Sequence, residues 1–194
     1  MPFDPIAHQE MLYREAISQG DAPAMQRCVD QVEWTVLERT LEVDGIITSP
    51  SVRSAATGGA VRLGSLIVPK QKRGQGLGTH ALRKILDLCD KQGRTMVISP
   101  ATDFGGSSVE RLKKFYARSG FVRNKGSKKD FTISELMYRL PFGRAHPSPA
   151  IVRDEKGGII PLAERYPLPN FPAELPGKTS QLPMLDQINE QRTL

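Results

Sequence analysis

Apolar residues in the first part of the chain recur at helical spacing and predict two helices. The stretch 5–20 ends at Gly20, and glycine is a common helix stop. Asp21 fits the N-cap of a second helix over 22–32. The residues that share the apolar face of this helix are Ala24, Met25, Cys28, Val29 and Val32.

Residues 33–50 leave two alternatives open. The pair Asp44–Gly45, flanked by β-branched residues, is typical of a two-residue hairpin turn and predicts a strand before it. Val36, Leu37 and Leu41 also fit a period of 3.6, so a helix before the turn stays open. We take the hairpin as the prediction.

The middle of the chain alternates between predicted strands and helices. The expected elements are a strand at 60–69, a helix at 76–93, a strand at 94–101, a helix at 109–120, a short strand at 121–124, a turn at 125–130 and a long strand at 131–141. The strand at 94–101 is apolar on both faces, which indicates a central position. This order predicts an α/β (α+β) fold with a sheet of mixed strand directions flanked by helices.

Composition changes after Pro141. Nine of the 15 prolines lie at or beyond that position, and this density prevents regular helix or internal strand. The expected organisation is a domain at 1–141, with N-terminal helices and hairpin at 1–59 and a core at 60–141, then an extended Pro-rich tail at 142–194 that carries a small docked hairpin at 150–166.

Charge divides unevenly along the chain. Residues 1–60 carry 4 basic and 9 acidic side chains, whereas residues 61–141 carry 17 and 6, a net charge of +11. Such a field favours an anionic partner, either nucleic acid or a phosphorylated small molecule; a solvated basic surface is the alternative. The chain shows no membrane-length apolar run, no signal peptide and only two cysteines, which favours the cytoplasm and excludes a membrane partner.

Three glycines lie in the basic stretch "PKQKRGQGLGTH" at 69–80, between a predicted strand and a predicted helix. The first turn of a helix offers unpaired N–H donors, and its dipole favours negative charge, so an anion is the expected ligand. A Walker loop would end in Gly-Lys-Ser/Thr, whereas Gly78 is followed by Thr79 and His80. A dinucleotide fingerprint needs a different glycine spacing and a later acidic residue.

The hexapeptide at 73–78, "RGQGLG", is similar to the acetyl-CoA-binding motif of the GNAT superfamily of N-acetyltransferases, and "FYARSGF" at 115–121 resembles a second block of that superfamily. The resemblance covers roughly residues 60–141. It implies a mixed, mostly antiparallel sheet with a splay beside the glycine loop. It also implies acetyl-CoA as co-substrate, an amine as acceptor, and no metal.

The resemblance carries roles over to particular residues. It implies that Tyr116 protonates the departing CoA thiolate, which is general acid catalysis. Asp103 is a candidate for receiving the amine or its proton, with helix capping as the alternative. The expected cofactor-binding residues are Ile67, Val68, Arg73, Gly74, Gln75, Gly76, Leu77, Gly78, Thr79, Ser107 and Ser108. Many members carry an asparagine where this chain has Val109, and the expected substitutes are the hydroxyls of Ser107 and Ser108 or the backbone of residues 104–108.

Other charged and polar residues are expected to be structural. Glu110 is read as a first-turn residue that favours the helix dipole, and His80 as a solvated side chain. The cluster Lys113, Lys114 and Arg118 is either solvent-facing charge or a contact for the CoA 3′-phosphate.

A narrower similarity links 103–141 to acetyltransferase domains encoded by bacteriophages and prophages, which implies a bacterial host's cytoplasm. The leading hypothesis is an acetyl-CoA-dependent N-acetyltransferase, monomeric or homodimeric. The alternative is a non-catalytic module that contacts a host protein or nucleic acid.

Overall fold

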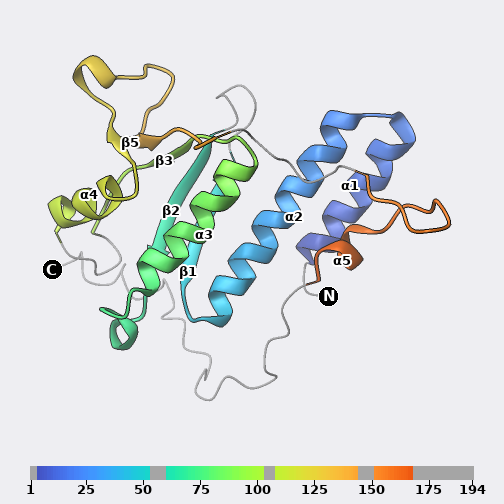
Figure 1. Ribbon diagram of the computed structural model, residues 1–194, viewed down its shortest axis with the longest axis horizontal. Helices are drawn as coiled ribbons and strands as arrows, with labels where there is room; N and C mark the ends of the chain where they lie inside the picture. The colour runs from blue at the N-terminus through green and yellow to red at the C-terminus, as the bar shows by residue number, and fades with distance from the viewer. Residues whose placement is uncertain (1–3, 53–59, 103–107, 144–150, 168–194) are drawn as a thin grey trace, which may run out of the picture.

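The computed structural model describes residues 4–52, 60–102, 108–143 and 151–167. In this part of the chain, five strands form one sheet and helices pack around it (Figure 1). The elements are α1 (Pro5–Gln19), α2 (Ala22–Val43), β1 (Ile47–Val52), β2 (Val61–Ile67), η2 (Lys70–Lys72), α3 (Leu77–Lys91), β3 (Met96–Ile98), α4 (Val109–Ala117), β4 (Val122–Arg123), η3 (Gly126–Lys128), β5 (Met137–Arg139) and α5 (Leu162–Arg165).

The sheet has the strand order β1-β2-β3-β5-β4. Only β2 and β3 run parallel among these neighbours; the other three pairs are antiparallel. A parallel pair needs a crossover, and α3 supplies it, lying in front of β1 and β2 in Figure 1. The prediction of a mixed α/β architecture is confirmed, as is the central position of the strand in 94–101.

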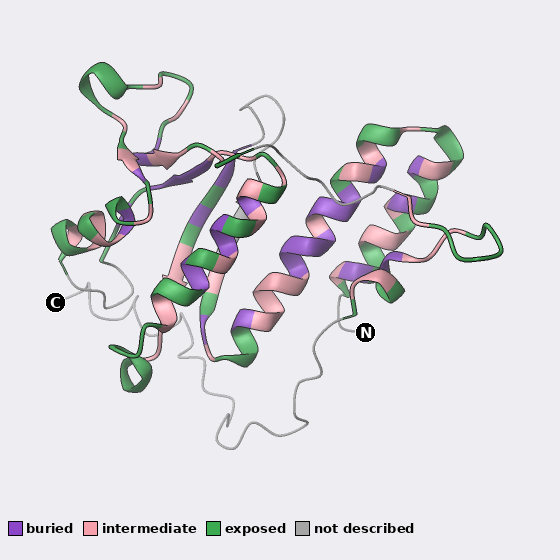
Figure 2. Cartoon of the chain, in the orientation of Figure 1, coloured by how far each residue is buried: buried purple, intermediate pink, exposed green. Residues whose placement is uncertain are grey.

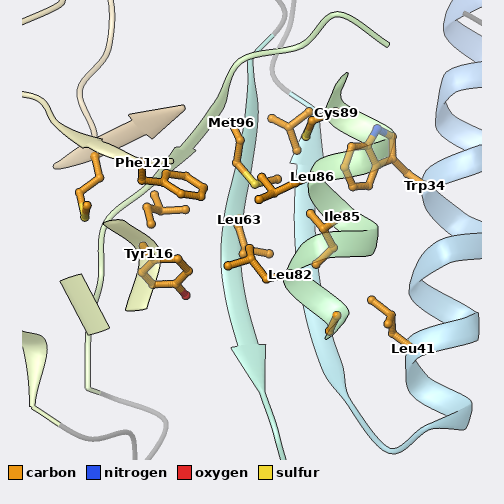
Figure 3. Packing of buried hydrophobic residues seen from close by; sticks show 14 of the residues in the cluster. Trp34, Leu41, Leu63, Leu82, Ile85, Leu86, Cys89, Met96, Tyr116 and Phe121 are labelled. Carbon is orange, nitrogen blue, oxygen red and sulfur yellow. The ribbon is translucent and has the colours of Figure 1, made fainter. Parts of the chain in front are cut away.

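The main core lies between the sheet, α3, α4 and the second half of α2. Figure 3 shows Ile85, Leu86 and Cys89 of α3 facing Met96 and Trp34. Figure 2 shows buried and exposed residues alternating along α3, as its amphipathic pattern predicts. Burying this apolar face against the sheet fixes where the N-terminus of α3 lies.

Four helices end in the same way, on a glycine in the left-handed conformation. Gly20, Gly45, Gly93 and Gly120 have φ between 64° and 88°. After each, the next amide donates to the carbonyl five residues back, as from Ile46 N to Leu41 O at 2.9 Å. This is the Schellman arrangement, which satisfies carbonyls at the helix end.

The hairpin expected at Asp44–Gly45 is therefore wrong, because α2 continues through Val43 and Gly45 terminates it. Leu37 and Leu41 carry the apolar face of α2 into the main core. The hydroxyl of Thr40 donates to Val36 O at 2.8 Å, so this β-branched residue is accommodated within the helix. Helical periodicity prevails over the local turn signal because it buries that face.

The long strand expected at 131–141 is also wrong, since β5 covers only Met137–Arg139. Asn124 holds the preceding residues in a loop. Its Nδ2 donates to the carbonyls of Asp130, Ile133 and Glu135 at 3.2, 2.7 and 3.2 Å, and its Oδ1 accepts from the Asp130 amide at 2.7 Å. These carbonyls are thereby withdrawn from strand pairing.

A second apolar cluster joins α1, the first half of α2 and residues 151–167. Leu162 is fully buried there, and its amide donates to Glu10 Oε2 at 2.6 Å. An antiparallel bridge between Arg153 and Ile159 precedes α5. This segment lies where the sequence indicated a small docked hairpin. The expectation that prolines prevent regular helix after Pro141 is wrong over Leu162–Arg165, because Pro161 stands at the N-cap of α5, where no amide donor is needed.

A polar seam, formed by Asp30, Glu33, Lys91, Gln92 and Arg94, joins α2 to the end of α3. Arg94 Nη2 lies 2.6 Å from Asp30 Oδ2, and Lys91 Nζ lies 2.9 Å from Glu33 Oε1. Gln92 donates to Glu33 Oε2 at 3.0 Å, and its carbonyl accepts from the indole of Trp34 at 2.9 Å. The seam links α2 to the end of α3 through polar groups that satisfy one another, apart from Arg94 Nε, which is buried without a hydrogen bond to any described residue.

Candidate functional site

A cavity of about 610 Å³ opens between β2, the glycine loop, the end of β3 and α4. The described residues that line it are Leu63, Gly64, Ser65, Leu66, Ile67, Val68, Lys72, Arg73, Gly74, Gly76, Leu77, Gly78, Thr79, Ile98, Ser99, Pro100, Ala101, Arg111, Leu112, Phe115 and Tyr116. This volume is within the range of pockets that hold small molecules and cofactors.

One wall of the cavity is the N-terminus of α3. Gly76 is the N-cap and has no side chain to accept a hydrogen bond from the first turn. No described residue accepts a hydrogen bond from the amides of Leu77, Gly78 or Thr79. Three backbone donors and the positive end of the helix dipole therefore face a cavity rather than a protein partner.

The conformation of the loop explains two of its glycines. Gly74 and Gly76 have φ of 83° and 78°, a region that side chains rarely adopt. A Cβ built on either glycine would meet no atom within 4 Å, so the backbone conformation, and not crowding, is what calls for glycine here. Gly78 has ordinary dihedrals and would place a Cβ 3.5 Å from Val68 Cγ2, which is normal contact.

Three cations line the cavity: Lys72, Arg73 and Arg111. No acidic side chain lines it among the described residues. Lys72 Nζ donates to Asp44 O at 2.9 Å, and Arg73 Nε donates to Val68 O at 3.0 Å, so both also fasten the loop to neighbouring backbone. The cavity is thus suited to an anionic ligand.

Another wall of the cavity comes from two strands that separate. β2 and β3 pair at Val61–Met96 and Arg62–Val97. Beyond these pairs, residues 63–68 and 98–101 both line the cavity. Leu112 and Phe115 of α4 add apolar surface. The cavity can accordingly take a ligand with one charged end and one less polar arm.

Tyr116 lies at the α4 side of the cavity and is 9% exposed. Its ring packs edge-on against Phe115 and Phe121, at centroid distances of 5.1 and 5.6 Å. Figure 3 shows its hydroxyl pointing away from Phe121, and no described residue hydrogen-bonds to it. Burial raises the pKa of Tyr116 above its ordinary value, so the phenol is protonated at neutral pH.

The structure brings most of the expected site residues to this one cavity. Those that line it are Ile67, Val68, Arg73, Gly74, Gly76, Leu77, Gly78, Thr79 and Tyr116. Gln75 is exposed and lies outside the described lining. Ser108 is the N-cap of α4, accepting from the Arg111 amide at 3.4 Å. Asp103 and Ser107 lie outside the described residues.

Sequence reasoning did not single out Arg111 and Phe115 as cavity residues. These two residues are four positions apart on α4 and share a helix face with Leu112 and Tyr116. The helical spacing from Tyr116 could therefore have identified them in the sequence. The basic residues near α4 that were singled out, Lys113, Lys114 and Arg118, do not line the cavity. Lys113, for example, pairs with Glu110 at 2.7 Å.

Among the described residues, no group of three or more His, Cys, Asp or Glu side chains is arranged to hold a metal ion. Nor does any helix among them combine the length and apolar character needed to cross a bilayer.

Comparisons with protein-family models, with curated proteins and with solved structures gave no match to this chain.

Proposed function

We propose that the chain is an acetyl-CoA-dependent N-acetyltransferase that acts on a primary amine. The observation that carries the proposal is the cavity itself, which joins an uncapped helix N-terminus to a buried, protonated tyrosine. An anion-binding end and a proton-donating end in one space are what a CoA thioester requires.

The residues present fit acetyl-CoA in charge and shape. The amides of Leu77, Gly78 and Thr79, with Lys72 and Arg73, would hold the pyrophosphate. The backbone of the separating strand β2 would hold the pantetheine arm, and the separation supports the splay that the GNAT resemblance implies. Val68 O already accepts from Arg73, which leaves its second lone pair and its amide for the ligand.

The chemistry asked of the protein is modest. Acetyl-CoA supplies an acetyl thioester, whose carbonyl carbon accepts the lone pair of the amine as the carbon–sulfur bond breaks. Tyr116 donates its proton to the leaving sulfur, and the proton lost by the amine nitrogen restores the phenol through solvent. The raised pKa of Tyr116 keeps that proton available throughout the neutral range. Apolar neighbours such as Leu112 and Phe115 exclude water from the thioester.

Replacing Tyr116 tests the proposal. Tyr116→Phe removes the proton donor and keeps the ring, so kcat should fall roughly 100-fold with little change in the affinity for acetyl-CoA. Tyr138→Phe is the matched control, because its hydroxyl bonds Lys128 O at 3.0 Å outside the cavity. Release of CoA thiol with a panel of amines measures turnover. Undiminished turnover in Tyr116→Phe would reduce Tyr116 to a packing residue.

The second candidate is a non-catalytic module, favoured by the net charge of +11 on residues 61–141. It predicts acetyl-CoA binding, or none, without thiol release for any amine. The panel of amines therefore includes proteins and nucleic acids with free amino groups, because thiol release with any of them would exclude a non-catalytic module.

A further inference from the structure

A second cleft, of about 590 Å³, lies at the β4 edge of the sheet. The described residues that line it are Phe121, Val122, Arg123, Lys125, Gly126, Ser127 and Lys128. None of them lines the first cavity. The lining residues belong to the stretch in which β4 leads into η3. This stretch lies at the upper left of Figure 1, on the same side of the molecule as α4. The cleft is thus a separate feature of the surface.

Side-chain hydrogen bonds fasten the loop that forms this cleft. Asn124 fastens it from inside through four hydrogen bonds to residues 130–135. Tyr138 fastens it from β5, its hydroxyl donating to Lys128 O at 3.0 Å. Lys125 and Lys128 therefore belong to a loop that is tied down by hydrogen bonds, and such ties lower the entropic cost of binding a partner.

The charge of this region is strongly one-sided. Between residues 109 and 129 the chain has eight Lys or Arg side chains and one acid, Glu110. Glu110 is itself paired, with Lys113 at 2.7 Å and Arg123 at 3.3 Å. Lys125 and Lys128 are exposed, and no described residue forms an ion pair or hydrogen bond with their side-chain nitrogens. The cleft presents positive charge that the protein leaves unneutralised.

An exposed aromatic side chain contacts Lys129, the residue that follows Lys128. Phe131 is 85% exposed, an unusual state for so large an apolar ring. Lys129 Nζ lies 4.6 Å from the centre of the ring. Lysines that bind phosphates, together with an exposed ring on which a base can stack, are the elements with which proteins bind single strands.

We propose that the β4–η3 cleft and Phe131 form a surface that binds single-stranded nucleic acid. Lys125 and Lys128 contact backbone phosphates, and an unpaired base stacks on Phe131. A duplex hides its bases from such a ring, and an acidic peptide offers charge without a stacking partner, so both fit less well. The inference is independent of the acetyl transfer proposed above, because the two sites share no residue.

Fluorescence anisotropy of a labelled oligothymidylate, titrated with the full-length protein at several salt concentrations, tests the inference. The wild-type protein should bind, with an affinity that falls steeply as salt rises. The double variant Lys125→Gln/Lys128→Gln removes two phosphate contacts, so the slope of log K against log salt should shrink in magnitude by about 1.4. Arg83→Gln/Lys156→Gln is the matched control, since it removes the same charge from exposed positions elsewhere and should leave the slope unchanged.

Phe131→Ala separates stacking from charge. It should weaken binding by about tenfold and leave the salt slope unchanged. Three results would overturn the inference: no binding of oligothymidylate at low salt, a Lys125/Lys128 variant that binds like the control, or equal competition by duplex DNA or polyglutamate. Circular dichroism of each variant excludes loss of folding as the cause.

Discussion

Two regions of the molecule use their polar groups differently. One is the polar seam between α2 and α3, and the other is the cavity beside the glycine loop. In the seam, carboxylates, amide and cations lie within 2.6–3.0 Å of one another, and Asp30 and Glu33 are almost fully buried. In the cavity, four donors have no hydrogen-bond partner among the described residues. They are the amides of Leu77, Gly78 and Thr79 and the hydroxyl of Tyr116.

This difference separates groups that hold the fold from groups that await a ligand. Leaving a buried donor unsatisfied is costly, so a protein pairs its polar groups wherever nothing else will pair with them. The seam follows that rule apart from Arg94 Nε, which is buried without a hydrogen bond to any described residue. The cavity instead gathers, in one space open to a ligand, several donors that lack a partner in the described part of the chain, and that is the physical reason for placing the ligand there.

Breaking the seam should have the largest effect on stability. Asp30→Asn leaves Arg94 as a buried cation without its carboxylate, and we expect the free energy of unfolding to fall by about 3 kcal/mol. Urea unfolding measures it. Glu42→Gln, in the exposed pair with Arg39, is the control and should change stability by less than about 0.5 kcal/mol. Equal effects in the two variants would show that the seam does not hold the fold.

Altering the glycine loop should strongly weaken acetyl-CoA binding and should reduce the free energy of unfolding less than breaking the seam does. Gly76→Asp places a carboxylate among the amides that face the ligand, so the affinity for acetyl-CoA should drop by about 100-fold or more. Gly157→Asp is the control, because both glycines have φ near 80° with no atom within 4 Å of a Cβ. The strain should cost both variants about 1 kcal/mol. If calorimetry finds normal acetyl-CoA binding by Gly76→Asp, the glycine loop is not the ligand site.

The paired carboxylate of Asp90 extends the comparison to the pH dependence of stability. Burial alone would raise the pKa of Asp90, but two hydrogen bonds from Arg139 at 2.7 Å and one from the Phe142 amide hold that pKa below its ordinary value. A depressed pKa contributes stability above the unfolded pKa, and this stability disappears as pH falls through the folded pKa.

Asp90→Asn should therefore reduce the free energy of unfolding by about 1.5 kcal/mol at pH 7 and flatten its decline below pH 4. Asp87→Asn, an exposed position on the same helix, serves as control. An unchanged acid limb of the stability profile in Asp90→Asn would contradict this account.

The unpaired carboxylate of Glu38 should make stability change with pH in the opposite direction. Glu38 is half-buried on α2, and no described residue forms an ion pair with it. Burial raises the pKa of Glu38 to about 7, while nearby Arg39 opposes the rise. The folded state binds this proton more tightly than the unfolded state, so stability is greatest below the unfolded pKa and is lost as pH rises through about 7.

Glu38→Gln should then increase the free energy of unfolding at pH 8 by about 1 kcal/mol, because part of the side chain is solvated, and should have no effect near pH 4. Thermal unfolding at the two pH values measures the difference. A Glu38→Gln variant that matches the stability of the wild type at both pH values would mean that Glu38 is solvated like any surface carboxylate.

Local signals predicted much of this fold, and the failures came where distant residues decide. Gly20, Gly93 and Gly120 were expected to end helices, and they do. Gly45 ends a helix by the same hydrogen bonds, but its neighbour Asp44 imitates a hairpin turn. Only the burial of Leu41 in the main core distinguishes the two, and burial depends on the folded chain.

The site shows the same limit. The glycine spacing and Tyr116 were visible in the sequence, since each belongs to a short motif. The cavity position of Arg111 was not, because it depends on which face of α4 meets the separating strands. The loop that replaces the expected strand at 131–136 depends on Asn124, whose amide reaches residues up to 11 positions away.

Calorimetric titration of the wild-type protein with acetyl-CoA, and with NADH as a control nucleotide, tests the central claim most directly. The account predicts saturable binding of acetyl-CoA with a micromolar Kd and no comparable binding of NADH. A folded protein that binds neither nucleotide would contradict it, because the unpaired donors that line the cavity would then not bind the pyrophosphate.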